Sequence, residues 1–217
     1  MIRVKICGIN DAAGFDATVA AAADWLGFVL FPGSPRAVTP AQAAGLSALW
    51  PGGPARVGLF VDPADDEVAA ALAALKLDVL QLYVPPARAV ALRARFDVPV
   101  WRAVGVTEAA ELPTRAEGVD GLIVEPKPPP GATRPGGNAV ALDWSLLAGW
   151  RAPLPWLLAG GLTPGNVAEA IQASGATAVD VSSGVERARG VKDPDMIRAF
   201  VSAARSVERR GGEHAQD

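Results

Sequence analysis

The stretch Val4-Lys5-Ile6-Cys7-Gly8 contains the pattern that decides the fold: a short apolar run ends in a turn, and an amphipathic segment follows. Seven further runs repeat this pattern at roughly even spacing. Parallel strands buried on both faces are nearly continuous runs of Val, Ile and Leu. Eight such strands alternating with helices predict a single (β/α)8 TIM barrel of the α/β class. The predicted strands are Val4–Cys7, Trp25–Leu30, Val57–Val61, Val79–Tyr83, Val98–Val104, Gly121–Glu125, Trp156–Ala159 and Ala178–Ser182.

Three segments between the strands carry a helix-start signal, which is a capping residue followed by proline. Proline suits the first helical position because its missing N–H would have no partner there in any case. The segment 107–118 is the weakest predicted helix, since it is acidic and Pro113 interrupts it. The three predicted helix starts are Thr39-Pro40, Thr163-Pro164 and Asp193-Pro194.

The length of 217 residues suits one barrel, and no linker divides the chain. We expect a catalytic domain over 1–207 and a polar, disordered tail over 208–217. No secretion signal precedes the first strand, and no apolar run approaches the ~20 residues that span a membrane. A single cysteine excludes an internal disulfide. These features predict a cytoplasmic protein with no membrane partner.

Composition also limits the chemistry. The net charge of −3 argues against a nucleic-acid partner, which requires a basic face. The only histidine, His214, lies in the predicted tail. A Ser-His-Asp triad and a histidine-based metal site are therefore not expected, and we predict neither a metal nor a cofactor. Acid–base chemistry must come from carboxylates, lysines, Cys7 or Tyr83.

In a (β/α)8 barrel the active site lies at the carboxyl ends of the strands. Two glycines, Gly160 and Gly161, follow the seventh predicted strand, and Ser182, Ser183 and Gly184 close the eighth. Backbone N–H groups after these two strands form the usual phosphate site of this fold. Alternatively, the glycines serve only to form turns. The two turns together in this register favour a phosphorylated small-molecule substrate.

Three further residues lie at the same end of the predicted barrel. Cys7 ends the first strand, where its thiol can act as a base, although a buried cysteine is often inert. Glu125 ends the sixth strand and is either salt-bridged or functional. Arg36 follows a Ser-Pro turn and is either a surface charge or an anion clamp. The Pro- and Gly-rich stretch 126–142 directly after Glu125 is interpreted as a lid.

From residue 2 to about residue 205 the chain resembles the phosphoribosylanthranilate isomerases of tryptophan biosynthesis. The resemblance implies an Amadori rearrangement of N-(5-phosphoribosyl)anthranilate to 1-(2-carboxyphenylamino)-1-deoxyribulose 5-phosphate, without a cofactor, in a monomer or a homodimer. The motifs that carry it are Val4-Lys5-Ile6-Cys7-Gly8, Gly27-Phe28-Val29, Ser34-Pro35-Arg36, Gly58-Leu59-Phe60-Val61, Leu80-Gln81-Leu82, Asp143-Trp144, Leu158-Ala159-Gly160-Gly161-Leu162 and Val179-Asp180-Val181-Ser182-Ser183-Gly184-Val185-Glu186.

The resemblance also assigns roles by position. Cys7 matches the general base, Arg36 matches the residue that holds the anthranilate carboxylate, and Asp180 matches a polar position near the substrate. The phosphate site corresponds to Gly160, Gly161, Ser182, Ser183 and Gly184.

Two positions depart from the family pattern. Glu125 stands where the family usually has an aspartic acid as general acid, and Tyr83 stands where it commonly has histidine. These departures keep two alternatives open. One is a phosphate-ligand binder that has lost efficient catalysis. The other is an isomerase for a related substrate with two phosphates, which would need a second phosphate site early in the barrel.

Overall fold

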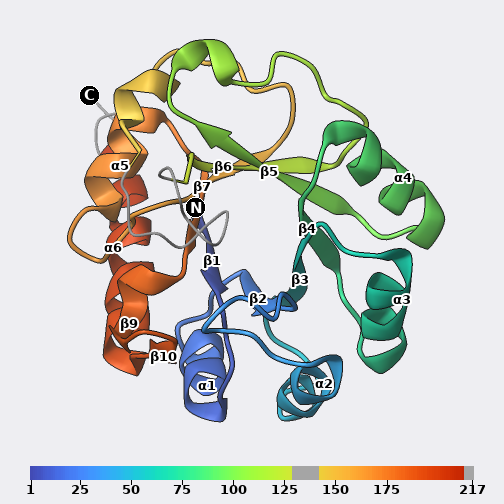
Figure 1. Ribbon diagram of the computed structural model, residues 1–217. Helices are drawn as coiled ribbons and strands as arrows, with labels where there is room; N and C mark the ends of the chain where they lie inside the picture. Colours follow the sequence, from blue (N-terminus) through green and yellow to red (C-terminus); the bar gives the residue numbers. More distant parts are fainter. Residues whose placement is uncertain (129–141, 213–217) are drawn as a thin grey trace.

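The computed structural model describes residues 1–128 and 142–212, and it confirms the predicted barrel. Eight parallel strands close into a ring in sequence order, with the last strand beside the first (Figure 1). Most strand interiors are buried on both faces, as the continuous apolar runs predicted, whereas four positions of β5 are only half-buried. The strands are β1 (Arg3–Cys7), β2 (Trp25–Val29), β3 (Ala55–Val61), β4 (Val79–Tyr83), β5 (Val100–Val106), β6 (Gly121–Pro126), β7 (Trp156–Leu158) and β8 (Ala178–Val181).

Helices surround the ring in most of the gaps between strands (Figure 1). The weakly predicted helix in 107–118 is only a 3-10 turn, η1, because the acidic stretch around Pro113 supports no longer helix. Another 3-10 turn, η2, lies between β6 and β7. The helical elements are α1 (Ala12–Ala20), α2 (Pro40–Ala48), α3 (Asp65–Ala74), α4 (Pro86–Phe96), η1 (Ala109–Glu111), η2 (Trp144–Leu147), α5 (Val167–Ser174), η3 (Ser183–Val185) and α6 (Pro194–Gly212).

Two of the three predicted helix starts are confirmed. Thr39 caps α2 in a reciprocal capping box, with Pro40 in the first turn. Asp193 accepts hydrogen bonds from two backbone N–H groups at the start of α6. The prediction at Thr163-Pro164 is wrong, because α5 begins at Val167. The side chain of Asn166 instead accepts the backbone N–H of Thr163, which holds the preceding residues in a turn.

The chain after β8 forms a small antiparallel hairpin before the last helix. Its strands are β9 (Glu186–Ala188) and β10 (Val191–Lys192), and Figure 1 places it outside the ring beside α1. The last helix, α6, continues to Gly212. Residues 208–212, assigned from sequence to a disordered tail, thus belong to this helix, while 213–217 lie outside the described residues. The domain boundary at 207 stays a prediction.

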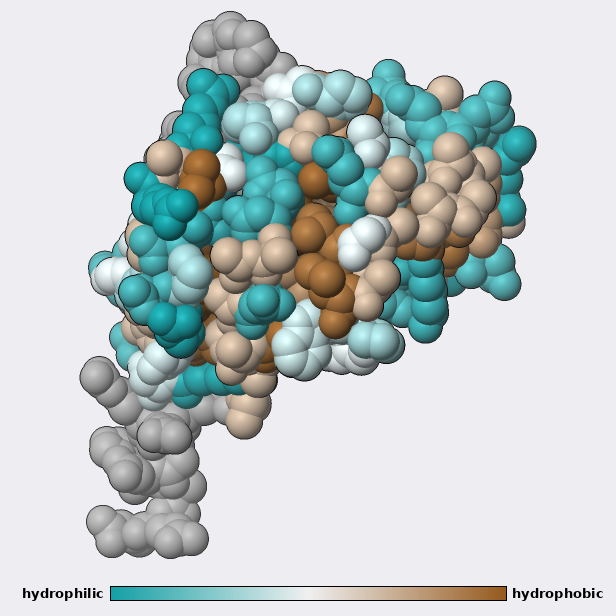
Figure 2. All heavy atoms as spheres, turned by 90° about the horizontal axis from the view of Figure 1, so that it is seen from below, coloured by the Kyte–Doolittle hydropathy of each residue, from teal (hydrophilic) through white to brown (hydrophobic). Residues whose placement is uncertain are grey.

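The main core fills the space between the strands and the helices. It includes Phe15 of α1, which stacks on Phe28 of β2 at a ring-centroid distance of 6.5 Å. Figure 2 shows polar residues spread over the face seen there, with apolar residues among them. In the described ranges, no helix is long and apolar enough to cross a lipid bilayer. The exposed large apolar side chains of those ranges are Met1, Leu49, Trp50 and Val90.

Replacement of Phe15 by alanine tests this core. Phe15 is fully buried, so Phe15→Ala is expected to lower the free energy of unfolding by about 3–5 kcal/mol. The control is Leu49→Ala, at a side chain 52% exposed, which should change it by about 0.5 kcal/mol or less. Urea unfolding followed by circular dichroism measures both. Equal losses in the two variants would contradict the packing described here.

Candidate active site

Ionisable side chains from four strands converge inside the ring near its carboxyl end. Lys5 of β1 and Asp180 of β8 occupy paired positions in adjoining strands. Electrostatic interactions link Glu125 of β6 to both of them, and link Tyr83 of β4 to Cys7 of β1. The groups therefore share one interior. This supports the expectation that the thiol and the carboxyl group approach a common space from different strands.

A buried ion pair forms the base of this space. The Nζ atom of Lys5 donates to Oδ1 of Asp180 at 2.9 Å, and the lysine side chain is fully buried. Burial lowers the pKa of Lys5, but the attraction of Asp180 and of Cys7 outweighs it, so that the pKa lies above its usual 10.5. Lys5 therefore stays charged beneath the thiol.

The thiol of Cys7 is enclosed, with only 3% of the residue exposed. A Cβ atom on the neighbouring Gly27 would lie 3.0 Å from Sγ of Cys7 and 3.2 Å from Nζ of Lys5, so this glycine provides space for both groups. Burial raises the pKa of Cys7 above 9.0, while Lys5 and Lys192 act in the opposite direction. The thiol is neutral at pH 7, and two nearby ammonium groups favour the thiolate when it forms.

Glu125 is buried, with 7% of the residue exposed, and its carboxylate forms no ion pair with a cation of the described residues. Burial is the largest influence on its carboxyl group and raises its pKa to about 8, although a hydrogen bond from Tyr83 opposes the shift. Strand β5 separates these two residues and has only Gly105 opposite Glu125. At neutral pH Glu125 is thus a protonated acid inside the ring.

The turns after β7 and β8 touch each other. A Cβ atom on Gly184 would lie 1.8 Å from the carbonyl oxygen of Leu162, so only glycine permits this approach. Gly160 and Gly161 have positive φ angles of 88° and 66°. The amide of Asn166 donates to the carbonyl of Gly161 at 3.0 Å and holds this turn. The two glycine-bearing segments therefore form one rigid edge of the mouth, with Ser182 and Ser183 directly before Gly184.

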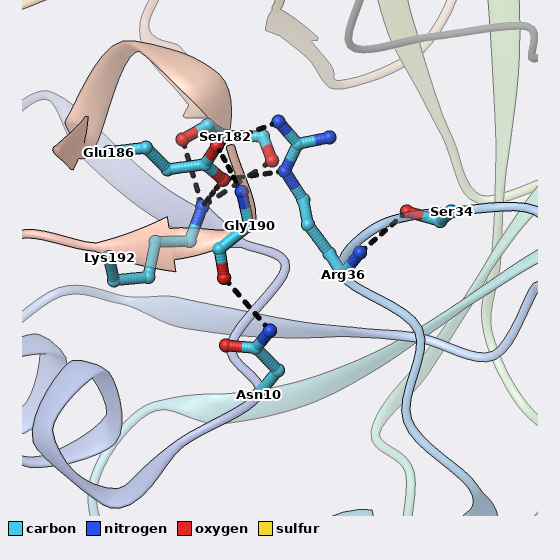
Figure 3. Close-up of polar contacts among 7 residues, drawn as sticks. All are labelled: Asn10, Ser34, Arg36, Ser182, Glu186, Gly190 and Lys192. Carbon is cyan, nitrogen blue, oxygen red and sulfur yellow. Dashed lines mark hydrogen bonds and ion pairs between the residues drawn. The ribbon is translucent and has the colours of Figure 1, made fainter. Parts of the chain in front are cut away.

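Arg36 lies beside the same mouth but is not a free cation. Its Nε and Nη2 atoms donate to the two carboxylate oxygens of Glu186 at 2.6 and 2.9 Å (Figure 3). The Nζ atom of Lys192 contacts the same carboxylate at 3.0 Å and the carbonyl of Ser182 at 2.8 Å. The hairpin β9–β10 thus supplies Glu186, which binds Arg36, and Lys192, which binds Glu186. The interpretation of Arg36 as a plain surface charge is wrong, because the residue is only 4% exposed.

An apolar cluster lines the mouth on the side of β1 to β4. Cys7, Val29 and Leu59 are its buried members, and Phe31 and Tyr83 pack against them. Such a surface accepts a flat apolar ring. Among the residues that the structure describes, no group of three or more His, Cys, Asp or Glu side chains could hold a metal ion.

The sequence comparisons point to one family. Residues 4–203 match the pattern that defines N-(5'-phosphoribosyl)anthranilate (PRA) isomerases. The enzyme of that name from Acidiphilium cryptum is 55% identical over 209 residues, which are 95% of this chain and 100% of the relative. The enzyme from Rhodospirillum rubrum is 53% identical, over 93% of this chain and 97% of its own length. The chain belongs to the PRA isomerase family.

Solved structures agree with this assignment. The phosphoribosylanthranilate isomerase of Thermotoga maritima is 33% identical, with a TM-score of 0.82 over 95% of this chain and 100% of its own. A phosphoribosylanthranilate isomerase solved in complex with reduced 1-(o-carboxyphenylamino)-1-deoxyribulose 5-phosphate is 32% identical, with a TM-score of 0.80 and the same coverage. The family resemblance seen in the motifs is thereby confirmed.

Among the residues predicted from sequence, the structure brings Cys7, Glu125 and Asp180 into one interior and joins the two glycine turns. It adds groups that sequence reasoning missed. Lys5 had a visible signal, since a lysine interrupts a buried apolar run. Glu186 followed the eighth strand closely, whereas nothing in the sequence marked Lys192.

Most of the predicted lid, 129–141, lies outside the described residues.

Replacement of Gly184 by alanine tests the joined turns. The new methyl group must push the turn after β8 away from Leu162, so ribose 5-phosphate should bind about tenfold more weakly, or about 1.4 kcal/mol. Titration calorimetry measures the dissociation constant. The control is Gly165→Ala, where the nearest atom to the new Cβ lies 3.8 Å away, and binding should not change. Unchanged binding in Gly184→Ala would exclude this edge as the phosphate site.

Proposed function

We propose that this chain isomerises N-(5'-phosphoribosyl)anthranilate in tryptophan biosynthesis, with Glu125 as general acid and Cys7 as general base. The observation that carries these roles is the convergence of a neutral carboxyl group and a thiol, from different strands, in one enclosed interior. An acid and a base that act on one sugar must reach it from different sides.

The first step uses the neutral form of Glu125. Its carboxyl proton passes to the ribose ring oxygen, the bond from that oxygen to C1′ breaks, and the nitrogen lone pair forms the Schiff base. A carboxyl group with a pKa of about 8 holds its proton at neutral pH and still releases it readily. The hydroxyl group of Tyr83 donates a hydrogen bond to the same carboxyl group and stabilises the carboxylate that remains.

The second step uses Cys7. Its thiolate removes the proton from C2′, and the electron pair moves towards the Schiff-base nitrogen to give an enolamine. The enolamine then loses its hydroxyl proton and gains one at C1′, which yields the ketose. Lys5, held by Asp180, stabilises the thiolate from below. The Glu125 carboxylate left by the first step accepts the hydroxyl proton, and the thiol of Cys7 returns its proton to C1′, so that both groups end in their starting forms.

Three regions of the mouth match the three parts of the substrate. The joined turns, with Gly160, Gly161, Ser182, Ser183 and Gly184, would bind the phosphate through backbone N–H groups. The apolar cluster around Val29 and Leu59 suits the aromatic ring. Arg36 suits the carboxylate of anthranilate. The relative solved with a reduced product analogue supports this class of ligand.

The same arrangement weighs against the two alternatives from the sequence. Glu125 and Tyr83, the two residues that differ from the family pattern, interact with each other. The site therefore keeps a carboxylic acid at the position of the general acid, which weighs against a loss of catalysis. The first half of the mouth has an apolar cluster where a second phosphate would need cationic or N–H donors. We therefore favour the substrate with one phosphate and one carboxylate.

Assembly and location are also proposals. We propose a monomer or a homodimer, and the Thermotoga maritima relative is a dimeric enzyme of which monomers have been generated. We propose a cytoplasmic location, because a catalytic thiol must stay reduced and reducing conditions prevail there.

Replacement of Glu125 by glutamine removes the proton that the first step needs. Glu125→Gln should lower kcat by about 10²- to 10⁴-fold, because general acid catalysis contributes about that much. Glu125→Asp keeps a carboxyl group and should retain much more activity. The loss of anthranilate-adduct fluorescence gives the rate, and complementation of a tryptophan auxotroph gives an independent readout. Normal turnover of Glu125→Gln would place the acid elsewhere.

The pH dependence of kcat/KM tests the pairing of acid and base. The pKa of Cys7 lies above 9.0 and that of Glu125 is about 8, so the base titrates above the acid. Between pH 7 and about 8 the thiolate fraction, and with it kcat/KM, should rise about tenfold per pH unit. Above about 8 the ionisation of Glu125 cancels this gain, and the profile should level off.

The matched control is Cys7→Ser, whose hydroxyl group does not titrate in this range. Its much lower residual activity should lack the rise between pH 7 and 8. A wild-type profile that is flat over the same interval would show that Cys7 is already ionised or is not the base.

A further inference from the structure

A buried cluster of three charged side chains joins Arg36 to the last turn of the barrel (Figure 3). Of its members, only Arg36 has been assigned a contact with the substrate. We propose that Glu186 is a positioning residue that fixes the guanidinium group of Arg36, so that its free edge faces the carboxylate of the substrate. This inference rests on the proposed function, because it concerns the residue assigned to that carboxylate.

The bidentate contact leaves one edge of Arg36 available. Nε and Nη2 both donate to Glu186, which orients the plane of the guanidinium group. Within the described part of the chain, Nη1 makes no hydrogen bond, and Figure 3 shows one terminal nitrogen pointing away from Glu186. A carboxylate approaching from the side of Nη1 would meet donors whose direction is already fixed. Pre-organisation of this kind lowers the cost of binding.

The charges of the cluster do not balance. Arg36 and Lys192 are two buried cations, and among the described residues Glu186 is the one carboxylate that contacts both. Burial raises the pKa of Glu186, but Arg36 and Lys192 outweigh it and bring the pKa to about 2, so Glu186 is ionised. The nearby pair of Lys5 and Asp180 adds no net charge. The excess positive charge calls for an anion from outside the chain, because unpaired buried charge is costly.

The backbone around Glu186 holds it firmly. The N–H of Gly190 donates to Oε2 of Glu186 at 3.0 Å, and Asn10 donates to the carbonyl of Gly190 at 2.9 Å. A Cβ atom on Gly190 would lie 2.6 Å from the carbonyl oxygen of Pro35, so the hairpin turn packs directly on the segment that carries Arg36. Ser34 accepts the backbone N–H of Arg36 at 3.1 Å within its own loop, while the hairpin fixes the guanidinium group (Figure 3).

Lys192 extends this arrangement to the proposed phosphate site. Its Nζ atom contacts Glu186 and the carbonyl of Ser182, the first residue after β8. One buried network therefore connects the residue for the carboxylate with the turn for the phosphate.

A purely structural role for Glu186 makes a different prediction. If the contact only ties the hairpin to the loop, its loss would impair all substrates equally. If Glu186 acts through Arg36, its loss would matter only for a substrate that has the carboxylate. The analogue made from aniline, N-(5'-phosphoribosyl)aniline, lacks that group and separates the two cases.

The test compares kcat/KM for the two substrates in Glu186→Gln. With the anthranilate substrate we expect a loss of about tenfold, chiefly through KM, with kcat changed by less than about threefold; this corresponds to about 1.4 kcal/mol. With the aniline analogue the loss should be less than about twofold. The matched control is Asp120→Asn, which breaks a bidentate contact with Arg93 on the outer surface and should affect neither substrate.

A second variant covers the case in which glutamine prevents folding. Glu186→Asp keeps the charge of the cluster but is too short for the same bidentate contact, and it should raise KM for the anthranilate substrate alone. Equal losses for both substrates, or no loss for either, in the folded variants would overturn the inference.

Arg36→Ala distinguishes this inference from the proposed function. If Arg36→Ala leaves KM for the anthranilate substrate unchanged, Arg36 does not bind the carboxylate and the proposed function loses that assignment. If Arg36→Ala raises KM while both Glu186 variants behave as wild type, only the positioning role fails. In the background of Arg36→Ala, Glu186→Gln should add no further loss.

Discussion

The ion pair between Lys5 and Asp180 is the interaction on which the rest of the site depends. It joins the first strand to the last where the ring closes, and its nitrogen–oxygen distance is 2.9 Å. Either charge alone in this interior would be strongly destabilising. Together they place a cation directly beneath Cys7, and Gly27 leaves the space that both groups need. The reactive thiol therefore owes its surroundings to closure of the barrel.

Two carboxyl groups inside the ring have different partners, and this difference separates their roles. Asp180 is paired with an ammonium group. Glu125 has no ion-pair partner in the part of the chain that the structure describes, and burial raises its pKa to about 8. Tyr83 partly offsets that rise through a hydrogen bond. Asp180 is thus engaged by Lys5, whereas the buried carboxyl group of Glu125 serves as an acid at neutral pH.

The substrate-facing side of the mouth is assembled from segments that are far apart in the chain. Arg36 and Glu186 are 150 positions apart, and Lys5 and Asp180 are 175 apart. Adjoining strands bring the second pair together, whereas the small hairpin after β8 brings the first pair together. This hairpin adds no strand to the barrel, yet it supplies two charged residues of the mouth. A short segment outside the barrel can therefore shape a site without altering the fold that carries it.

The sequence by itself determined the eight strands, the barrel and the end of the barrel that bears Cys7, Glu125 and the glycine turns. Burial on both faces and turn chemistry are local properties, so they are visible in consecutive residues. Local signals also misled, since Thr163-Pro164 has the composition of a helix start but forms a turn held by Asn166. Only the tertiary structure decided which charges pair. The contacts of Glu186 with Arg36, and of Tyr83 with Glu125, depend on how distant segments meet when the ring closes.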